Sequence, residues 1–394
     1  MAVTPQVRDA EADVRPRVML LGSGELSREL AIALRHLGAT VIAVDEYADA
    51  PAHGVADQSV VIPMTDADEL SKVVQRLHPD FVVTAADAVA AQALEALEGA
   101  MSAGPDSART RLVPSARTVR LTSDREGLRR LAADELGLPT APFWFVGSAG
   151  ELEALGAHAG YPLLVKPVVG AVGRGQSVVA GPDDIGAAWQ RAGAQRVLAE
   201  TVVEVEFSVT LLAVRSEGAG GPVIEFCSPI GHRSAEAEVL ESWQPQKMSA
   251  AALDAAKSIA ARIVKALGGR GVFGVELMIN GDEVYFADVT PRPPGSAWVT
   301  VRSQRLSAFE LQARTILGLP VDTIMVSPGA ARAIYPAGSP TADALSGALG
   351  VPESDLRVFG RGFQALATAP EVTIARGRAR EVASRLNARD VASR

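Results

Sequence analysis

The chain has 394 residues, 48% of them hydrophobic and 21% charged, with a formal net charge of −8 at pH 7. This length exceeds the roughly 100–200 residues of a usual single domain, so we expect two or three domains. The negative charge argues against a broad nucleic-acid or anionic-membrane surface, and no run approaches the ~20 apolar residues of a membrane span. The lone Cys227 excludes an intramolecular disulfide, and no apolar leader follows a basic segment, so the cytoplasm is the expected compartment.

Strand and helix patterns alternate over the first third of the chain, after a polar stretch at residues 1–16 that predicts a loose tail. A short apolar run at residues 17–21 predicts a buried strand, and apolar residues at helical spacing from 25 to about 37 predict a helix behind it. Strands that alternate with helices in this way predict a parallel sheet with crossover helices. We therefore expect an α/β, Rossmann-like domain at residues 17–122.

A Gly-Ser-Gly turn at residues 22–24 joins this strand to this helix, and Asp45 ends the next strand about twenty residues on. The arrangement is typical of dinucleotide-binding turns, but Ser27 stands where their third glycine belongs. A tight strand-to-helix turn also explains the glycines, and amides at a helix N-terminus would suit an anionic ligand. Glu25 on the turn would repel a pyrophosphate and would suit an amine.

The pattern changes from about residue 139, where short strands follow one another with few helices between them. This spacing predicts α+β sheet layers around a cleft, and we place this second domain at residues 123–325. A pair of charged helices from residue 117 to about 137 is expected to join it to the first domain. Residues 326–394 are expected to form a small C-terminal domain that ends in a surface helix.

Lys166 ends an apolar strand and is followed by Pro167, so its ammonium can project from a sheet edge into a cleft. The glycine-rich stretch 170–176 that follows carries one cation, Arg174, and would suit folding over phosphates. Glu200 ends another apolar strand and could accept hydrogen bonds from an adenine or a ribose. The alternatives are an ordinary hairpin turn for the glycine-rich stretch and a surface acid for Glu200.

Glu276 and Asp288 each interrupt an apolar strand, at residues 272–279 and 283–289, and the Asn-Gly pair between these strands predicts a hairpin. Two carboxylates that face one another on paired strands repel each other unless a cation lies between them. Mg²⁺ that bridges to ATP phosphates meets this need. Arg292, just past Asp288, could then stabilise charge that develops during phosphoryl transfer. The alternative is two exposed edge acids and a turn arginine.

Seven short motifs resemble those of one enzyme family, in the same order along the chain. They are VMLLGSGEL at 18–26, VDEYADAPA at 44–52, DREG at 124–127, VKPV at 165–168, ESWQPQ at 241–246, FGVEL at 273–277 and PRP at 291–293. They indicate an ATP-grasp fold, and the nearest resemblance is to the formate-dependent phosphoribosylglycinamide formyltransferase family over about residues 17–370. That family makes formyl phosphate from formate and ATP and transfers the formyl group to the amine of glycinamide ribonucleotide.

The resemblance implies a set of ATP contacts, a metal pair and acceptor contacts. The ATP contacts it implies are Arg125, Lys166, Ala171, Val172, Gly173, Arg174, Gly175, Gln176, Glu200, Thr201, Val202, Val203 and the position of Ser208. Glu276 and Asp288 would hold Mg²⁺, and Arg292 would join Lys166 in catalysis. Glu25 and Leu26 would touch the acceptor. The expected partners are a small carboxylate, an amine and a second copy of the chain as a homodimer, with neither nucleic acid nor membrane.

The chain departs from the family mainly on the acceptor side. The family has a glutamate where this chain has Ala85, and an aspartate in the run where this chain has Gly295. Its phosphate-binding lysine and arginine pair reduce to Arg361 in a shortened loop, and losing two such contacts would cost roughly 3–6 kcal/mol of binding free energy. We therefore hypothesise that carboxylate activation is retained and that the acceptor is another amine, in a specialised pathway.

Departures in the nucleotide site are milder. The family's second metal glutamate is Asp288 here, and a glutamate expected on the ribose is Ser208, for which Glu204 or Glu206 could substitute. These changes leave open a protein that binds nucleotide without turnover. The sequence also admits the housekeeping formyltransferase of purine biosynthesis and, from the turn at 22–24 alone, a nicotinamide oxidoreductase.

Three further side chains are expected to be structural. His232 and Trp243 are predicted to lie in packed loops, with a place along the cleft as the alternative. The other histidines, His36, His53, His78 and His158, show no metal-ligand spacing. Cys227 follows a predicted strand, and we expect it in the core rather than as a nucleophile.

Overall fold

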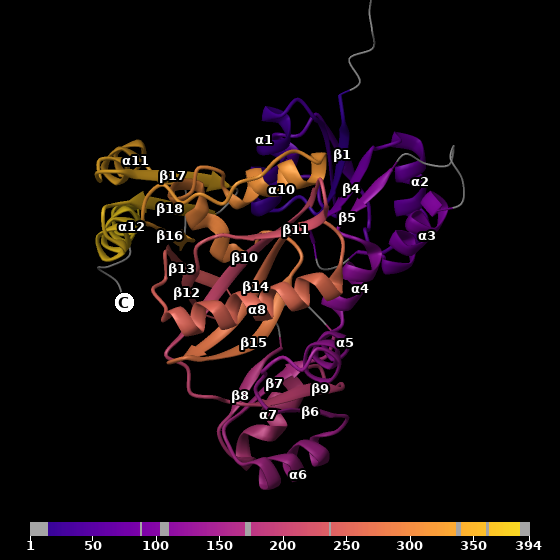
Figure 1. Cartoon of the computed structure of the whole chain (residues 1–394), viewed down its shortest axis with the longest axis vertical. Coiled ribbons are helices and arrows are strands. Elements are labelled where there is room, and N and C mark those ends of the chain that lie inside the picture. The colour runs from indigo at the N-terminus through magenta and orange to yellow at the C-terminus, as the bar shows by residue number, and fades with distance from the viewer. Residues whose placement is uncertain are drawn as a thin grey trace, which may run out of the picture.

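The computed structural model describes residues 15–86, 89–102, 110–169, 175–235, 238–335, 340–359 and 362–386. Within these residues the strands form three sheets, of five, nine and four strands. Figure 1 shows the four-stranded sheet at the lower end of the long axis and the other two sheets above it. The candidate active site lies where these three sheets approach one another.

The five-stranded sheet is parallel, in the order β3-β2-β1-β4-β5, as the alternating sequence pattern predicts. Its strands are β1 (Arg17–Leu21), β2 (Thr40–Asp45), β3 (Gln58–Val61), β4 (Phe81–Thr84) and β5 (Arg111–Val113). The helices beside it are α1 (Glu25–His36), α2 (Ala67–Leu77) and α3 (Ala91–Ser102), with a 3₁₀ turn η1 (Pro51–Gly54). Met19 packs with α2 and α3 while Leu20 packs with α1, so helices cover both faces.

The four-stranded sheet is antiparallel, in the order β6-β9-β7-β8. Its elements are β6 (Phe143–Val146), α6 (Ala149–Ala159), β7 (Leu163–Pro167), β8 (Ser177–Val179), η3 (Pro182–Asp184), α7 (Ile185–Arg191) and β9 (Val197–Thr201). Leu152 of α6 and Ile185 of α7 pack on the buried side of this sheet. The Ala- and Gly-rich α6 has only a weak apolar period, which is why the sequence predicted few helices here.

The nine-stranded sheet runs in the order β15-β14-β10-β12-β13-β16-β18-β17, and β11 pairs with the far part of β10. Its strands are β10 (Phe207–Gly218), β11 (Gly221–Phe226), β12 (Ile230–Ala235), β13 (Glu238–Gln244), β14 (Gly271–Asn280), β15 (Glu283–Thr290), β16 (Gly329–Ile334), β17 (Ser354–Phe359) and β18 (Gly362–Thr368). Leu211 packs with α8 (Ala250–Leu267), whereas Leu212 packs with α10 (Ala308–Leu317) on the opposite face. Successive strand residues point to opposite faces, so one strand supports both layers.

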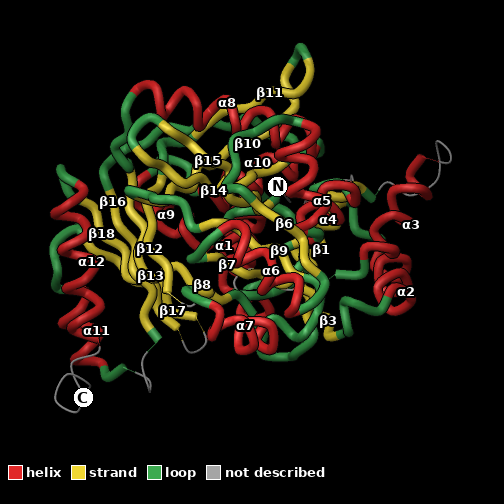
Figure 2. Tube along the Cα trace, turned by 90° about the horizontal axis from the view of Figure 1, so that it is seen from below, coloured by secondary structure: helices red, strands yellow, loops and turns green. Residues whose placement is uncertain are grey.

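Strands β16, β17 and β18 belong to the segment expected to form the C-terminal domain, and they continue the nine-stranded sheet through the pairing of β13 with β16. The helices α11 (Ala342–Leu349) and α12 (Val372–Leu386) lie together beside these strands (Figure 2). Glu241 on β13 is fully buried and accepts hydrogen bonds of 3.0 Å from Arg376 and Arg380 of α12. A backbone ladder and a buried ion pair therefore join this segment to the central one.

The connection between the first two sheets is helical, as predicted, and consists of α4 (Ala116–Ser123), α5 (Arg125–Arg130) and a π-helical turn η2 (Leu131–Glu135). Thr118 of α4 donates a 3.0 Å hydrogen bond to the carbonyl of Leu267, at the end of α8. On the other side, Leu30 of α1 and Ile316 of α10 share one apolar cluster. No described helix combines the length and the apolar character that a membrane crossing requires.

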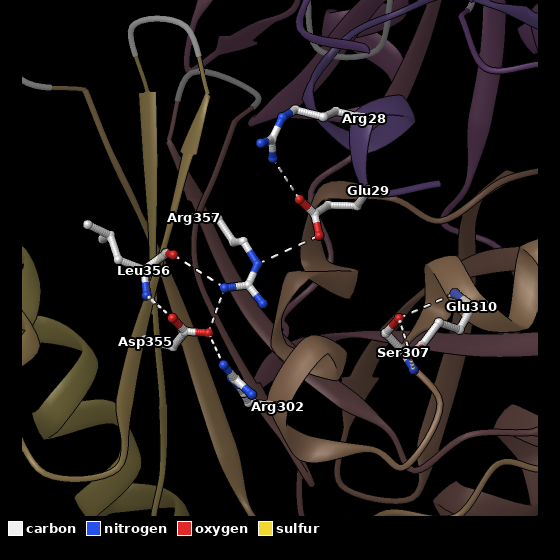
Figure 3. A network of polar contacts seen from close by, with 8 residues as sticks. All are labelled: Arg28, Glu29, Arg302, Ser307, Glu310, Asp355, Leu356 and Arg357. Carbon is white, nitrogen blue, oxygen red and sulfur yellow. Dashed lines mark hydrogen bonds and ion pairs between the residues drawn. The ribbon is translucent and has the colours of Figure 1, made fainter. Parts of the chain in front are cut away.

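A polar network crosses from α1 to β17 (Figure 3). The Glu29 carboxylate lies 3.1 Å from the Arg28 guanidinium and 3.7 Å from that of Arg357. Arg357 in turn contacts Asp355 at 2.6 Å, and Asp355 also pairs with Arg302 of the short helix α9 (Thr300–Ser303). Burial raises the pKa of Glu29 above its ordinary value, although Arg357 and Arg28 work to lower it.

Candidate active site

A pocket of about 290 Å³ lies between the four-stranded sheet, α5 and β15. Its lining combines cations, one carboxylate and apolar side chains. The lining residues are Arg125, Leu128, Arg129, Lys166, Leu198, Phe286, Ala287 and Asp288. Three cations, one acid and an apolar floor suit a ligand that has both an apolar ring and anionic groups.

Glu200 is the centre of a buried ion-pair cluster on the wall of this pocket. Lys166 on β7 donates a 2.6 Å hydrogen bond to Glu200 on β9, and Arg129 on α5 pairs with the other carboxylate oxygen. Arg129 also donates to the carbonyls of Phe286 (3.3 Å) and Ala287 (3.1 Å) on β15. The side chains of Arg129 and Glu200 are only 5% and 6% exposed, so each charge depends on the other. Glu200 is therefore not the surface acid of the alternative interpretation.

Arg129 did not emerge from the sequence. It lies among several arginines of a charged helix, and only burial distinguishes it from Arg130, whose side chain is 58% exposed. The Arg129 guanidinium also lies 5.7 Å from the centre of the Phe143 ring, which adds a cation–π contact. A charged helix that precedes a strand with a buried acid is a weak signal for such a pair.

The remaining predicted ATP contacts are placed in part. Arg125 of α5 donates to the carbonyl of Pro167, at the end of the strand that carries Lys166. Ala171, Val172, Gly173 and Arg174 lie outside the described residues. Gly175 has φ +72°, and a side chain there would meet the carbonyl of Arg191 at 3.0 Å, so this position requires glycine. Gln176 follows it and leads into β8.

The end of β9 lies beside the pocket. Thr201 ends this strand, and its amide donates to the carbonyl of Pro142, while that of Val202 donates to Pro162. Val202 is 47% exposed, and Val203 follows it in an irregular stretch. Ser208, in contrast, lies on β10, directly opposite His232 of β12 and Met278 of β14. It therefore faces the sheet surface that also bears Glu276.

Glu276 and Asp288 are direct cross-strand partners, as the hairpin pattern predicts. The Asn-Gly turn joins β14 to β15, with Gly281 at φ +58°, and the register shifts just after Glu276. Asp288 accepts a 2.8 Å hydrogen bond from the amide of Val289. Burial nevertheless raises the pKa of Asp288, although Lys166, Arg129 and Arg125 work to lower it. A cation bound at this carboxylate would favour its charged form.

This pair fits a divalent cation that shares its ligands with a phosphate. Carboxylate oxygens are hard ligands, and Mg²⁺ is commonly held by one or two carboxylates while substrate phosphates complete its shell. Across the described residues no group of three or more His, Cys, Asp or Glu is arranged to hold a metal by itself. Glu276 and Asp288 therefore suit Mg²⁺ that arrives with a nucleotide, and the pocket beside Asp288 suits the nucleotide.

His232 lies on the strand β12, and the prediction that it lies in a packed loop was wrong. Trp243, also predicted to lie in a packed loop, lies on β13, where Arg376 stacks over its ring at 3.8 Å. The polar stretch around His232 concealed the strand, because its alternate residues face a polar surface rather than a core. His232 Nε2 lies 2.8 Å from Glu276 Oε2. Burial works to lower the pKa of His232, but the contact with Glu276 raises it, and the net pKa lies above its ordinary value.

A second pocket, of about 300 Å³, lies between α1 and the loop after β15. Its lining residues are Leu26, Ser27, Leu30, Val83, Thr84, Ala85, Arg292, Pro293, Phe309 and Gln312. The structure therefore brings together Leu26, Ala85 and Arg292, which lie far apart in the sequence. Glu25 is the exposed first residue of α1. Gly295 begins the 3₁₀ helix η4 (Gly295–Val299) just beyond Pro293, and Arg361 lies outside the described residues.

The turn at residues 22–24 has a structural explanation. The Ser23 amide donates a 2.6 Å hydrogen bond to Asp45, whose other oxygen accepts from the amide of Glu46. Gly22 has φ +103°, and a side chain there would lie 2.6 Å from Cβ of Ala86. The carboxylate of Asp45 is thus committed to the turn, and it does not project toward a ribose as a dinucleotide site would require.

Cys227 lies in the core, 2% exposed, and burial raises the pKa of its thiol to about 12. A thiol with such a pKa is a poor nucleophile near neutral pH. This agrees with the structural role predicted for it.

Comparison with known proteins supports the same assignment. Residues 131–309 match the ATP-grasp domain family, and residues 16–113 match the ribonucleotide synthetase preATP-grasp domain family. The chain is 46% identical to a protein of Rhodococcus jostii named formate-dependent phosphoribosylglycinamide formyltransferase, over 94% of each chain. A protein of the same name in Mycolicibacterium smegmatis is 45% identical, over 95% of this chain and 97% of its own.

The chain belongs to the formate-dependent phosphoribosylglycinamide formyltransferase family of ATP-grasp enzymes. It is accordingly an ATP-dependent ligase that forms a C–N bond, and the predicted ATP-grasp fold and enzyme class are confirmed.

Solved structures agree with this membership. A structure titled glycinamide-RNase-transformylase T from Mycobacterium tuberculosis is 68% identical, with a TM-score of 0.83, over 94% of this chain and 100% of its own. N5-carboxyaminoimidazole ribonucleotide synthetase from Thermus thermophilus is 26% identical, with a TM-score of 0.80, over 94% of this chain and 98% of its own. The fold of the formyltransferase family is thus shared with enzymes of a different name.

Proposed function

We propose that this chain uses ATP and Mg²⁺ to activate formate and transfers the formyl group to the amine of glycinamide ribonucleotide. The observation that carries the proposal is the cross-strand pair of Glu276 and Asp288 beside a pocket that holds Lys166, Arg129 and Arg125. The names of relatives at 45–46% identity, and of a solved structure at 68%, support this acceptor better than the other amine that we inferred from Ala85 and Gly295.

The cationic pocket would bind the nucleotide. Lys166 and Arg125 would contact the phosphates, while the apolar side chains of Leu198 and Phe286 would face the adenine. Because Glu200, which Arg129 orients, holds the Lys166 ammonium in place, little side-chain entropy remains to be lost when ATP binds. Such preorganisation favours catalysis by position and charge.

Glu276 and Asp288 would hold Mg²⁺ against the ATP phosphates. When bound, the ion would neutralise charge on the transferring phosphoryl group. The carboxylate oxygens of these two residues would set the position of the ion, because both strands are anchored in the nine-stranded sheet. A side-chain nucleophile is not needed, since a formate oxygen attacks the γ-phosphorus directly and ADP leaves.

The pocket of Leu26, Ala85 and Arg292 would receive the amine half of the reaction. The amine nitrogen attacks the carbonyl carbon of formyl phosphate, inorganic phosphate leaves, and the nitrogen gives up a proton. Arg292 lies on this side of the sheet and would stabilise the departing phosphate. Phe309 and Pro293 make the pocket largely apolar, which limits access of water to a hydrolysable acyl phosphate.

A coupled ADP-release assay tests the proposal. MgATP and formate are supplied with glycinamide ribonucleotide or with a panel of unphosphorylated amines. We expect formate-dependent ADP release that requires glycinamide ribonucleotide, and complementation of a purine auxotroph that relies on formate. Release with another amine and none with glycinamide ribonucleotide would restore the other-acceptor hypothesis, and no release with any acceptor would favour a nucleotide-binding protein without turnover.

A further inference from the structure

We propose that His232 and Thr210 are positioning residues that fix both oxygens of the Glu276 carboxylate for the divalent cation. The inference rests on the proposed function, because it concerns a ligand of the metal proposed there. It adds two residues from neighbouring strands that the sequence did not connect with the metal.

The sheet register places these side chains on one surface. Thr210 of β10 lies directly opposite Glu276 of β14. His232 of β12 lies opposite Ser208 of β10. Ser208 is two residues before Thr210, so both residues point to the same face of the sheet, and His232 shares that face. The His232 ring therefore reaches Glu276 diagonally across β10. Three adjacent strands thus converge on one carboxylate.

The contacts divide the carboxylate between two partners. Thr210 donates a 3.0 Å hydrogen bond to Oε1 of Glu276, while Nε2 of His232 lies 2.8 Å from Oε2. A hydroxyl has one proton, and Thr210 gives it to Glu276. The 2.7 Å contact between Thr210 and Ser296 is then a hydrogen bond that Ser296 donates. A chain of donors runs from η4 to Glu276.

Burying polar side chains such as these costs folding free energy unless they form polar contacts. Thr210 and Ser296 are fully buried, and the His232 side chain is 9% exposed. Among the described residues neither ring nitrogen of His232 has a partner with hydrogen-bond geometry, so the 2.8 Å approach of Nε2 to Oε2 of Glu276 is a close polar contact. An apolar side chain would fill this place without leaving a buried nitrogen unsatisfied. Packing alone therefore does not explain why residue 232 is a histidine. A role in orienting the Glu276 carboxylate does explain it.

Both oxygens of the Glu276 carboxylate can still bind a cation. Each carboxylate oxygen has about two lone-pair sites, and each has one protein partner here. The Glu276 side chain is 27% exposed, and its cross-strand neighbour is Asp288. Partners in a second layer around a metal commonly orient its ligands in this way, and their loss typically costs 10–100-fold in metal affinity.

Mn²⁺ binding, measured by electron paramagnetic resonance on the full chain with a non-hydrolysable ATP analogue, tests the inference. We expect His232→Ala and Thr210→Val each to raise the Mn²⁺ dissociation constant about 10–100-fold. Affinity for the analogue in EDTA should be unchanged. His232→Gln should restore most of the Mn²⁺ affinity, because its amide can donate to the same oxygen, and a merely structural histidine would not show this rescue.

Ser242→Ala is the matched control. Ser242 is buried on β13, directly opposite His232, and its hydroxyl has no hydrogen-bond partner among the described residues. This variant should bind Mn²⁺ like the parent. Parent-like Mn²⁺ affinity in both folded variants, His232→Ala and Thr210→Val, would overturn the inference and leave the proposed function standing. A parent that binds no Mn²⁺ with the analogue would overturn both.

Discussion

The nucleotide side and the acceptor side of this active site are built differently. On the nucleotide side, Lys166, Glu200 and Arg129 form a buried cluster on regular strands and a helix, and Glu276 and Asp288 are paired by register. On the acceptor side, the pocket of Leu26, Ala85 and Arg292 is lined by α1, the end of β4, α10 and the loops that follow β4 and β15. Charges on paired strands are held by the backbone ladder, whereas Leu26, Ala85 and Arg292 lie at or just beyond the ends of their elements, where single substitutions can change the pocket.

Removal of Arg129 should have the largest effect. Arg129→Ala leaves Glu200 buried with only Lys166 beside it, so we expect the free energy of unfolding to fall by about 3 kcal/mol, the lower end for breaking a buried ion pair. Arg130→Ala on the same helix removes an exposed arginine and should cost less than about 1 kcal/mol. Urea unfolding of both variants measures the difference, and equal losses would show that the cluster contributes no special stability.

Lys166→Ala should then show how much catalysis depends on the nucleotide side. The loss of a preorganised cation on the phosphates should lower kcat for ADP release on the order of 100- to 1,000-fold. Lys72→Ala removes an exposed lysine on α2 and should leave kcat as in the parent. Steady-state kinetics with saturating MgATP make the comparison, and a Lys166→Ala enzyme within a few-fold of the parent would remove this residue from the phosphate site.

Ala85→Leu should affect only the acceptor side. The larger side chain overfills the second pocket, at a cost of about 1–3 kcal/mol, so kcat/KM for the amine should fall roughly 5- to 150-fold. KM for ATP should stay unchanged, because Ala85 does not line the nucleotide pocket. Ala251→Leu, on the exposed start of α8, is the control. An increase in KM for ATP instead would show that the two sides are not separable.

Asp288→Asn should produce the smallest effect, a change in stability that depends on pH. Burial raises the pKa of Asp288, so this group contributes stability that is fully present below its ordinary pKa and is lost as pH rises through the raised value. In EDTA near pH 7 the variant should therefore melt at a higher temperature than the parent, and the gap should narrow toward about pH 4.

The exposed Asp254 on α8 provides the control, and Asp254→Asn should show little change at either pH. Thermal melts of the metal-free proteins by circular dichroism are the measurement. A metal-free Asp288→Asn variant that melts below the parent at pH 7 would contradict the view that burial penalises the charged form of Asp288.

Regular patterns carried most of what the sequence could predict. The parallel sheet and the hairpin of Glu276 and Asp288 followed from alternation and from an Asn-Gly turn, which are local features. Arg129 and His232 could not be found in this way, because their importance comes from partners 71 and 44 residues away in the chain. The joining of β16 to β13 is likewise a long-range pairing that no local pattern contains.

The shared sheet has a consequence for how such an enzyme diversifies. The β17–β18 hairpin and the metal-bearing hairpin β14–β15 occupy opposite ends of one hydrogen-bonded sheet. Insertions or deletions at the tip of the first hairpin need not disturb the register of the second, because seven strand pairings separate β17 from β15. The β17–β18 end of this sheet can therefore be changed, by evolution or by design, while the β14–β15 end keeps its structure.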